Sequence, residues 1–487
     1  MNMTSFYDIG ALLNRNYVSR GQLNYEMLFG APPYEQLKKR VEEILAGNQA
    51  VVAAPGVPGA GKTTFYAYIL ARYLKDNICR EGISFGYLYI YIAPTNDLVR
   101  DFIEKFLRFL RGTSGVECQP EILSKRIRVY GSKISAPNYP QLLKAIDDEV
   151  LLVASTDWQR VAARILARKE QVYLIDEASR MTLTRFFISI ADAIAKGNAK
   201  GDIRGFSVIG DENQAVGLEE EERRFLLLSS IREIAKKGSD RVYIVRLNVS
   251  WRLPEDTARP IKFGFYNGNL IGKGTPFKVN PEDEIIRTLM REKLCQKYSK
   301  DIWDILQVAS KSSLVHIELG EHFQMGEKYD EKRAELGWCL AYVLSSLVGN
   351  RQVSVVVPYT QMAFAIRILS SATRMLRPPQ NIRVATIASY LGREDDIIIS
   401  IFGKEQVSQC NTYYLTDPYT FNVQLSRQRN ALFTIGSANI LKKSAEYCIE
   451  ISEKKPRKKM LIEGWEKLAR TLDELQKIKS SYTINPA

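Results

Sequence analysis

From about residue 34 to residue 440, short apolar runs alternate with longer stretches in which polar and apolar positions mix. Apolar runs without internal alternation are typical of strands buried on both faces of a parallel sheet. Clear examples occupy residues 51–54, 87–92, 172–175 and 353–357. The amphipathic stretches between such runs are typical of crossover helices. The pattern predicts an α/β fold built on mostly parallel sheets.

The chain has 487 residues, which is too long for one ordinary core. Because a domain usually takes about 100 to 200 residues, we expect two to four domains. Two segments interrupt the alternation: residues 276–312 are charged and helix-like, and a basic tail starts at 443. The expected division is an N-terminal extension (1–33), two α/β domains (34–250 and 251–442), small inserts at 101–150 and 276–312, and a basic helical tail (443–487).

The composition is that of a folded protein with a positive charge. Hydrophobic residues make up 45% of the chain, charged residues make up 25%, and the net charge is +13. Such a charge attracts polyanions such as nucleic acid or an anionic membrane. The basic cluster at 454–459 is suited to phosphate contacts, although a run of charges is more often a solvated face.

Cysteine and histidine usage argues against a metal centre. The six cysteines are at least 38 residues apart, so they form neither a metal-binding knuckle nor a compact disulfide framework. We expect them to be reduced core residues of a protein inside the cell, in the cytoplasm. His316 and His322, the two histidines, do not favour metal binding or histidine catalysis. Without a secretion signal or a long apolar stretch, the sequence predicts neither export nor a membrane span.

Residues 56–63 read GVPGAGKT, a phosphate-binding loop between a predicted strand and a predicted helix. In such a loop the glycines let backbone N–H groups surround a phosphate, and the helix N-terminus adds positive potential. Lys62 suits the β- and γ-phosphate oxygens, and the Thr63 hydroxyl suits Mg²⁺. The loop therefore predicts ATP and Mg²⁺ as cofactors.

The predicted strand at 172–175 ends in Asp176 and Glu177. Two adjacent carboxylates at a strand end are poorly explained by packing. Asp176 suits the Mg²⁺ site, and Glu177 suits activation of a water that attacks the γ-phosphate. Hydrolysis is thus favoured over nucleotide storage. A small nucleotide kinase shares the loop but is about half this length, so it ranks low.

Further motifs follow in order: VIGDENQ at 208–214, SWRLP at 250–254, TIASYLGREDD at 386–396 and NVQLSRQR at 422–429. The ordered set resembles superfamily 1 helicases, and most closely their 5′-to-3′ branch, which includes the nonsense-mediated-decay RNA helicase and its DNA-acting relatives. The resemblance spans about residues 34 to 440. It implies two RecA-like P-loop NTPase domains that face each other across one ATP, with nucleic acid lying over both.

The resemblance also implies site residues. In the catalytic set, Lys62, Asp176, Glu177 and the γ-phosphate sensor Gln214 are joined by two arginine fingers, Arg252 and Arg427. The metal ligands would be Thr63 and Asp176. Residues implied to bind the nucleotide are Gln36, which reads adenine, Gly56, Gly59, Ala60, Gly61, Lys62, Thr63, Thr64, Trp251, Gly392 and Glu394. Residues implied to bind the polymer backbone are Pro94, Thr95, Asn96, Ser155, Thr156, Pro358, Tyr359 and Thr386. Tyr359 and Tyr390 are also candidates for base stacking, although burial in the core is at least as common for tyrosine.

The sequence departs from the family at two places. Leu391 stands where relatives usually have a glutamine, which removes one hydrogen bond in the nucleotide pocket. Only 35 residues precede Gln36, and the stretch 101–150 is short. We therefore expect no N-terminal barrel-and-stalk domain and a reduced helical insert, which bears on strand separation more than on ATP hydrolysis.

The sequence thus predicts a monomeric ATP- and Mg²⁺-dependent motor that moves on single-stranded DNA or RNA and unwinds duplexes 5′ to 3′. Partner proteins would bind the 276–312 insert or the basic tail. A remodelling ATPase without unwinding activity is one alternative. A nucleic-acid-binding protein that uses the nucleotide as a switch is another, although it would not need the complete catalytic set.

Overall fold

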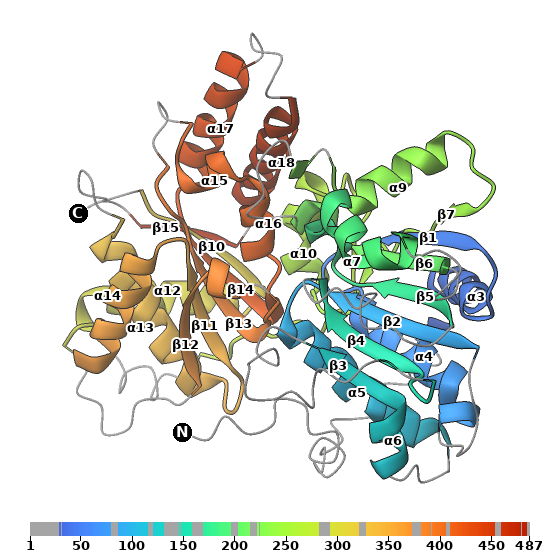
Figure 1. Ribbon diagram of the computed structural model, residues 1–487. Helices are drawn as coiled ribbons and strands as arrows, with labels where there is room; N and C mark the ends of the chain where they lie inside the picture. Colours follow the sequence, from blue (N-terminus) through green and yellow to red (C-terminus); the bar gives the residue numbers. More distant parts are fainter. Residues whose placement is uncertain are drawn as a thin grey trace. The chain divides into compact units, whose positions relative to one another are not determined.

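A computed structural model of the chain divides into two compact units (Figure 1). Residues 1–56 and 61–247 form the first, and residues 57–60 and 248–487 form the second. The structure describes residues 29–30, 32–78, 86–114, 120–130, 146, 148–157, 169–195, 203–214, 222–223, 225–281, 293–320, 328–372, 381–390, 392–405, 410–452, 459–478 and 480–484. Most of the 1–33 extension, His322, Leu391 and basic residues 454–458 lie outside these ranges.

The first unit contains a seven-stranded parallel sheet in the order β3-β4-β2-β5-β6-β1-β7. Its strands are β1 (Ala50–Pro55), β2 (Tyr87–Ala93), β3 (Ile127–Tyr130), β4 (Leu152–Thr156), β5 (Glu170–Ile175), β6 (Ile203–Gly210) and β7 (Val242–Ile244). The apolar runs that predicted strands lie in β1, β2 and β5. All strands point the same way, so the loops after β1, β2, β4, β5 and β6 emerge at one edge of the sheet, where ligands of parallel sheets bind.

Helices connect these strands. They are α3 (Tyr34–Leu45), α4 (Lys62–Ile78), α5 (Asn96–Ser114), α6 (Pro120–Arg126), α7 (Leu183–Ala195) and α9 (Leu227–Lys236), with short 3₁₀ turns η4 (Ala178–Arg180) and η6 (Glu212–Gln214). Part of the segment expected as an insert, 101–150, supplies most of α5, all of α6 and the edge strand β3.

The second unit contains a six-stranded parallel sheet in the order β12-β11-β13-β14-β10-β15. Its strands are β10 (Leu314–Glu318), β11 (Val353–Val357), β12 (Ile382–Thr386), β13 (Asp395–Ile401), β14 (Gln428–Gly436) and β15 (Ser481–Thr483), and β8 (Val249–Ser250) pairs separately with β9 (Ile271–Gly272). The predicted α/β class with two parallel sheets is confirmed.

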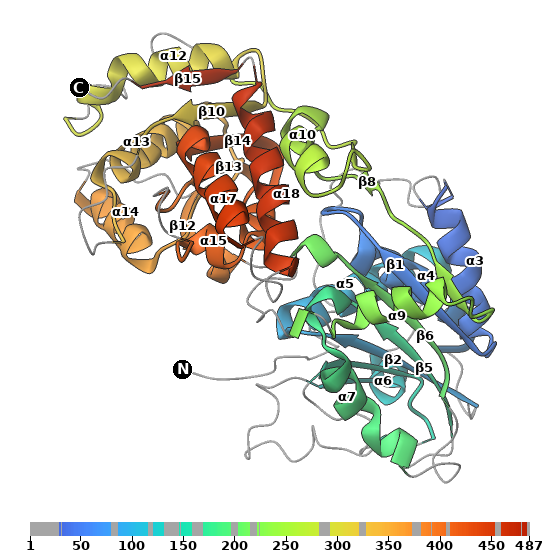
Figure 2. The same ribbon diagram turned by 90° about the horizontal axis from the view of Figure 1, so that it is seen from above.

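The helices of the second unit are α10 (Glu255–Gly264), α12 (Ser299–Ala309), α13 (Glu331–Leu347), α14 (Thr360–Ala372), α15 (Tyr413–Thr416), α16 (Tyr419–Gln424), α17 (Ala438–Ser452) and α18 (Lys459–Gln476), with 3₁₀ turns η7 (Gln296–Tyr298) and η8 (Ala388–Tyr390). α17 and α18 run side by side (Figure 2). The segment expected as a tail thus supplies most of α17, together with α18 and the edge strand β15, to this unit.

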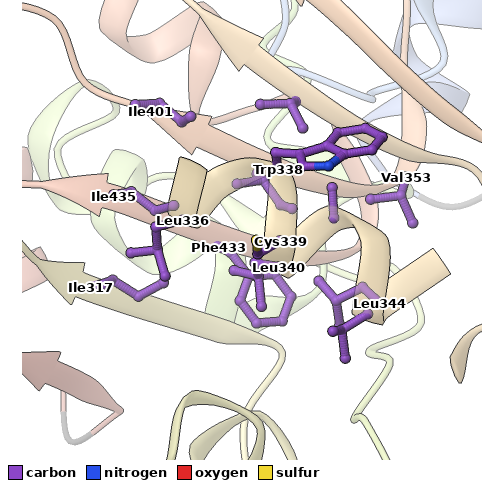
Figure 3. Close-up of a cluster of buried hydrophobic side chains, with 14 of the residues drawn as sticks. Ile317, Leu336, Trp338, Cys339, Leu340, Leu344, Val353, Ile401, Phe433 and Ile435 are labelled. Atoms are coloured by element: carbon purple, nitrogen blue, oxygen red, sulfur yellow. The ribbon is translucent and has the colours of Figure 1, made fainter. Parts of the chain in front are cut away.

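One face of the second sheet packs on α13 (Figure 3), and residues of α12 and α14 belong to the same core. Alternate residues of its strands, such as Ile397 and Ile399 of β13, enter this core with Leu340 and Leu344 of α13, and all four are fully buried. Removing this much apolar surface from water is the main stabilising contribution to such a layer. The core fixes the strands whose ends carry the predicted motifs.

The expectation of reduced cysteines is wrong for four of the six. Cys295 is bonded to Cys339, and Cys410 is bonded to Cys448. These pairs are 44 and 38 residues apart along the chain, but their Cα atoms lie 5.5 and 5.7 Å apart because tertiary packing brings the segments together. Cys79 and Cys118 lie outside the described residues. Among the described helices, none is both long and apolar enough to cross a membrane.

Candidate nucleotide and nucleic-acid site

The predicted phosphate-binding loop links β1 to the first turn of α4. Gly59 and Gly61 have φ angles of 70° and 73°, which side chains disfavour, so the loop's course requires glycine there. Lys62 is the first residue of α4, and its Nζ donates a hydrogen bond to the Gly56 carbonyl at 3.3 Å. The loop therefore has the strand-to-helix setting that phosphate binding requires. Thr64 follows in the first turn of α4.

Asp176 and Thr63 meet beside this loop. The Thr63 hydroxyl donates to Asp176 Oδ2 at 2.6 Å, although the residues are 113 positions apart. Asp176 is fully buried, and burial together with the charge of Glu177 raises the pKa of its carboxyl group. A buried carboxylate whose negative charge is unfavourable is suited to a divalent cation. Thr63 and Asp176 offer a hydroxyl and a carboxylate, the oxygen donors that fit a Mg²⁺ whose other ligands are phosphate and water.

Glu177 adopts a left-handed backbone conformation with φ 47° and ψ 39°. For a residue other than glycine this conformation costs roughly 1 to 2 kcal/mol. Its backbone N–H donates to Asp176 Oδ1 at 2.8 Å, which compensates part of that cost. Strain of this kind clusters at functional sites, where it places a side chain. The backbone at Glu177 therefore supports a chemical role for this residue.

Gln214 ends η6, just beyond β6, and is 8% exposed. Gly210, the last residue of β6, allows close approach of the turn after Glu177, because a Cβ there would lie 2.7 Å from the Ser179 nitrogen. The Asp211 N–H donates to Ser179 Oγ at 3.1 Å. The structure thus ties the Gln214 segment to the Asp176–Glu177 segment. Ser179 was not among the predicted site residues.

The polymer-binding candidates of the first unit follow two neighbouring strands, β2 and β4. Pro94 and Thr95 come directly after β2, and Asn96 begins α5. The Thr95 hydroxyl accepts a hydrogen bond from the Leu98 N–H at 3.4 Å, in the manner of a helix cap. Ser155 and Thr156 end β4, and among the described residues the buried Thr156 hydroxyl has no hydrogen-bond partner.

In the second unit Glu394 and Arg429 lie at the N-terminal ends of β13 and β14, and they form a charged trio with Arg252, which follows β8. Glu394 Oε2 accepts a hydrogen bond from Arg252 at 2.6 Å, and its Oε1 accepts two from Arg429, at 2.8 and 3.0 Å. Although partial burial acts in the opposite direction, the charges of Arg252 and Arg429 lower the pKa of Glu394 to about 2. Arg429 was not predicted; it follows Arg427 by two positions, and the motif alone does not distinguish their contacts.

The two predicted arginine fingers differ in setting. Arg252 contacts Glu394, whereas Arg427 is only 6% exposed and donates from Nε to the Val423 carbonyl at 3.0 Å. The Trp251 N–H donates to the Gly59 carbonyl at 3.0 Å, and a Cβ at Gly59 would lie 2.5 Å from Arg252 Cβ. These contacts group residues 57–60 with the second unit.

The remaining candidates lie on other segments of the chain. Gln36 is exposed in the first turn of α3, and Gly392 is exposed with a φ of 79°. Pro358 and Tyr359 follow β11, and the Tyr359 hydroxyl accepts a hydrogen bond from the Lys404 N–H at 3.2 Å.

Thr386 ends β12 and forms a turn with Ser389. Tyr390 is 1% exposed and its hydroxyl donates to Asp395, so this tyrosine does not offer its ring to a base.

The fold and the loop define a P-loop nucleotide-binding protein with two RecA-like units. A family model described as a DEAD/DEAH box helicase matches residues 36–231, and one described as an AAA domain matches residues 227–439. None of the curated proteins matches the sequence. A solved structure of arterivirus nonstructural protein 10, a helicase in complex with DNA, is similar with a TM-score of 0.36 and 14% identity, covering 82% of this chain and 62% of that chain.

The two family models together cover residues 36–439, which include all of the motifs described above. Together the two matches support a superfamily 1 helicase. The match to a DEAD/DEAH box helicase model argues against the small nucleotide kinase alternative. The chain covers less than two thirds of the length of the arterivirus helicase.

Proposed function

We propose that this protein is an ATP-driven motor that moves along single-stranded nucleic acid and unwinds duplexes from 5′ to 3′. The observation that carries the proposal is the cluster at the first sheet edge. There Lys62 follows the glycine loop, Thr63 contacts Asp176, and Glu177 is held in a strained backbone conformation. A protein that uses nucleotide only as a switch has no need of this complete hydrolytic set. The polarity rests on the resemblance of the ordered motifs to the 5′-to-3′ branch.

Each residue of the cluster has a distinct task. Lys62 binds the β- and γ-phosphates, and Gln214 senses the γ-phosphate. Thr63 and Asp176 would hold Mg²⁺, which neutralises phosphate charge when bound. Glu177 orients the attacking water and takes its proton. We assign Arg252 and Arg427 the role of arginine fingers, which can contribute about 10³ to 10⁵ in rate by stabilising charge on the transferred phosphoryl group.

The polymer-binding candidates suit contacts with any sequence. Thr95, Asn96 and Thr386 offer hydroxyl and amide groups next to strand ends, and such groups bind phosphates and sugars without reading bases. A motor that moves along a strand needs this lack of sequence preference. We propose that it acts as a monomer.

The first test changes Lys62→Ala. We expect ATP turnover stimulated by single strands to fall by at least about 10³-fold, because the γ-phosphate loses its cationic partner, while the polymer still binds. Lys39→Ala, an exposed change on α3, serves as the control and should hydrolyse ATP like the unaltered protein. Turnover retained in Lys62→Ala would contradict the assignment of this loop.

A second experiment separates unwinding from simple translocation. Duplexes with a 5′ or a 3′ single-stranded tail are incubated with the protein and ATP, and strand release is measured. We expect release from the 5′-tailed duplex. ATP turnover without release from either duplex would favour a remodelling ATPase. Stimulation by single-stranded DNA and RNA, compared in the same assay, assigns the substrate, since only RNA offers 2′-hydroxyl contacts.

A further inference from the structure

Asp176 receives a hydrogen bond from a residue outside all the helicase motifs. The Tyr91 hydroxyl donates to Asp176 Oδ2 at 2.8 Å, the same oxygen that accepts from Thr63. The other carboxylate oxygen accepts from the Glu177 N–H. Tyr91 lies on β2, which neighbours the strand β5 that leads into Asp176 (Figure 1).

The strand that carries Tyr91 also holds the backbone of Asp176. The Asp176 N–H donates to the carbonyl of Ile92, the next residue along β2, at 2.8 Å. Both the main chain and the carboxylate of Asp176 are therefore attached to adjacent residues of one strand. This double attachment leaves the carboxylate little freedom to rotate.

The ring of Tyr91 is fixed as firmly as its hydroxyl. It stacks on Phe102 of α5 with a centroid distance of 3.7 Å and an angle of 6° between the planes, and both rings are fully buried. A phenylalanine would fill the same space without burying a hydroxyl. Burying a hydroxyl costs free energy unless it is hydrogen-bonded. The Tyr91 hydroxyl has that compensation at Asp176.

We propose that Tyr91 is a positioning residue that holds the Asp176 carboxylate in the orientation needed to ligate Mg²⁺. The proposal rests on the proposed function, in which Asp176 is the metal-binding carboxylate. Groups that hydrogen-bond to a metal ligand commonly contribute about 10- to 100-fold to metal affinity or activity, because they fix the ligand's orientation. Without the Tyr91 hydroxyl, the contact with Thr63 alone would restrain Oδ2.

The test is Tyr91→Phe, which removes one oxygen and keeps the ring that packs on Phe102. Tyr173→Phe is the matched control, because Tyr173 is also fully buried, on the adjacent strand β5, but its hydroxyl donates to Gln171 Oε1 at 2.7 Å. Binding of a fluorescent ADP is measured in excess chelator and across a Mg²⁺ titration. ATP turnover with single strands is measured across the same titration, with kcat and KM separated.

We expect Tyr91→Phe to bind ADP normally in chelator and to need about 10-fold more Mg²⁺ for half-maximal effect in both assays. Tyr173→Phe should match the unaltered protein. A purely structural role would lower the melting temperature of Tyr91→Phe and leave its Mg²⁺ requirement unchanged, which would overturn the proposal. Failure of the proposed function would give a different result, because the unaltered protein itself would then show no ATP turnover.

Discussion

At the scale of single residues, Glu394 shows how charges are balanced beside the first residues of β13 and β14. Its side chain is 36% exposed, yet it accepts three hydrogen bonds from two arginines. Hydrogen bonds between ionised groups are stronger than neutral ones, and the two donations from Arg429 to Oε1 also restrain this guanidinium. Glu394 therefore holds Arg252, a proposed arginine finger, in a defined position within its own unit.

The low pKa of Glu394 gives a pH prediction with a definite sign. Its folded pKa is about 2, against about 4.3 in an unfolded chain, so its ion pairs stabilise the fold fully above about pH 5 and are lost towards about pH 2. In Glu394→Gln, we expect the fall in unfolding free energy between about pH 6 and about pH 3 to be smaller by roughly 1 kcal/mol, allowing for solvent screening. Urea unfolding at the two pH values measures it.

Glu450→Gln on α17 is the control, because Glu450 is exposed and belongs to no ion pair that involves the described residues. Its pH dependence should follow that of the unaltered protein. If the unfolding free energy of Glu394→Gln fell with pH as much as that of the unaltered protein, the two arginines would not stabilise the folded state through this carboxylate.

At the scale of elements, the approach of α10 to α18 depends on one glycine. A Cβ at Gly264 would lie 1.8 Å from Thr471 Oγ1 and 2.8 Å from the Lys467 carbonyl oxygen. Such distances are far below van der Waals contact, so any side chain there forces the helices apart. Small residues at a helix crossing allow this kind of close packing. α18 is thereby fixed against the helix that follows the Trp251–Arg252 segment.

We expect Gly264→Ala to lower the free energy of unfolding by about 1 to 3 kcal/mol, which is typical of overpacking a filled interface. Gly112→Ala on α5 is a matched helical substitution, since a Cβ there meets nothing within 4 Å. That change should stabilise the first unit by about 0.5 to 1 kcal/mol, because alanine favours helix. The unfolding free energies of both variants and of the unaltered protein are measured by urea unfolding, with circular dichroism as the signal. Equal effects would contradict the close approach.

The sequence identified central strands better than edge strands. The run at 353–357 coincides with β11 because a strand covered on both faces stays apolar throughout. The edge strands β12 and β15 are partly exposed and carry no such run. Their positions depend on pairing with neighbours, which apolar patterning does not encode.

For the site, local motifs were informative and contacts between distant segments were not. The loop at 56–63 and the Asp176–Glu177 pair were recognisable because each lies within a few consecutive residues. The contacts of Tyr91 with Asp176 and of Arg429 with Glu394 depend on the order of strands in each sheet. The bond between Cys295 and Cys339 likewise depends on packing across 44 residues. Spacing along the chain gives no indication of these partners.

At the scale of the whole molecule, the net charge of +13 and the polar groups at the strand ends both suit contacts with a phosphate backbone. Contacts with phosphates release the counterions that surround a nucleic acid strand, so the affinity depends on salt. Hydroxyl and amide contacts to the backbone add little sequence preference. The combination predicts that a strand binds mainly through charge and that added salt weakens the complex.

For single strands the slope of log affinity against log salt is about −0.7 for each phosphate neutralised. If about five phosphates are contacted, the slope is about −3.5, and the affinity should fall roughly 100-fold between about 50 and about 200 mM KCl. Fluorescence anisotropy of a labelled oligothymidylate measures this, with sucrose at equal osmolality as the control, since it does not screen charge. A slope shallower than about −1 would mean that phosphate neutralisation contributes little, and the polymer-binding assignment of these strand ends would then have to rest on base stacking instead.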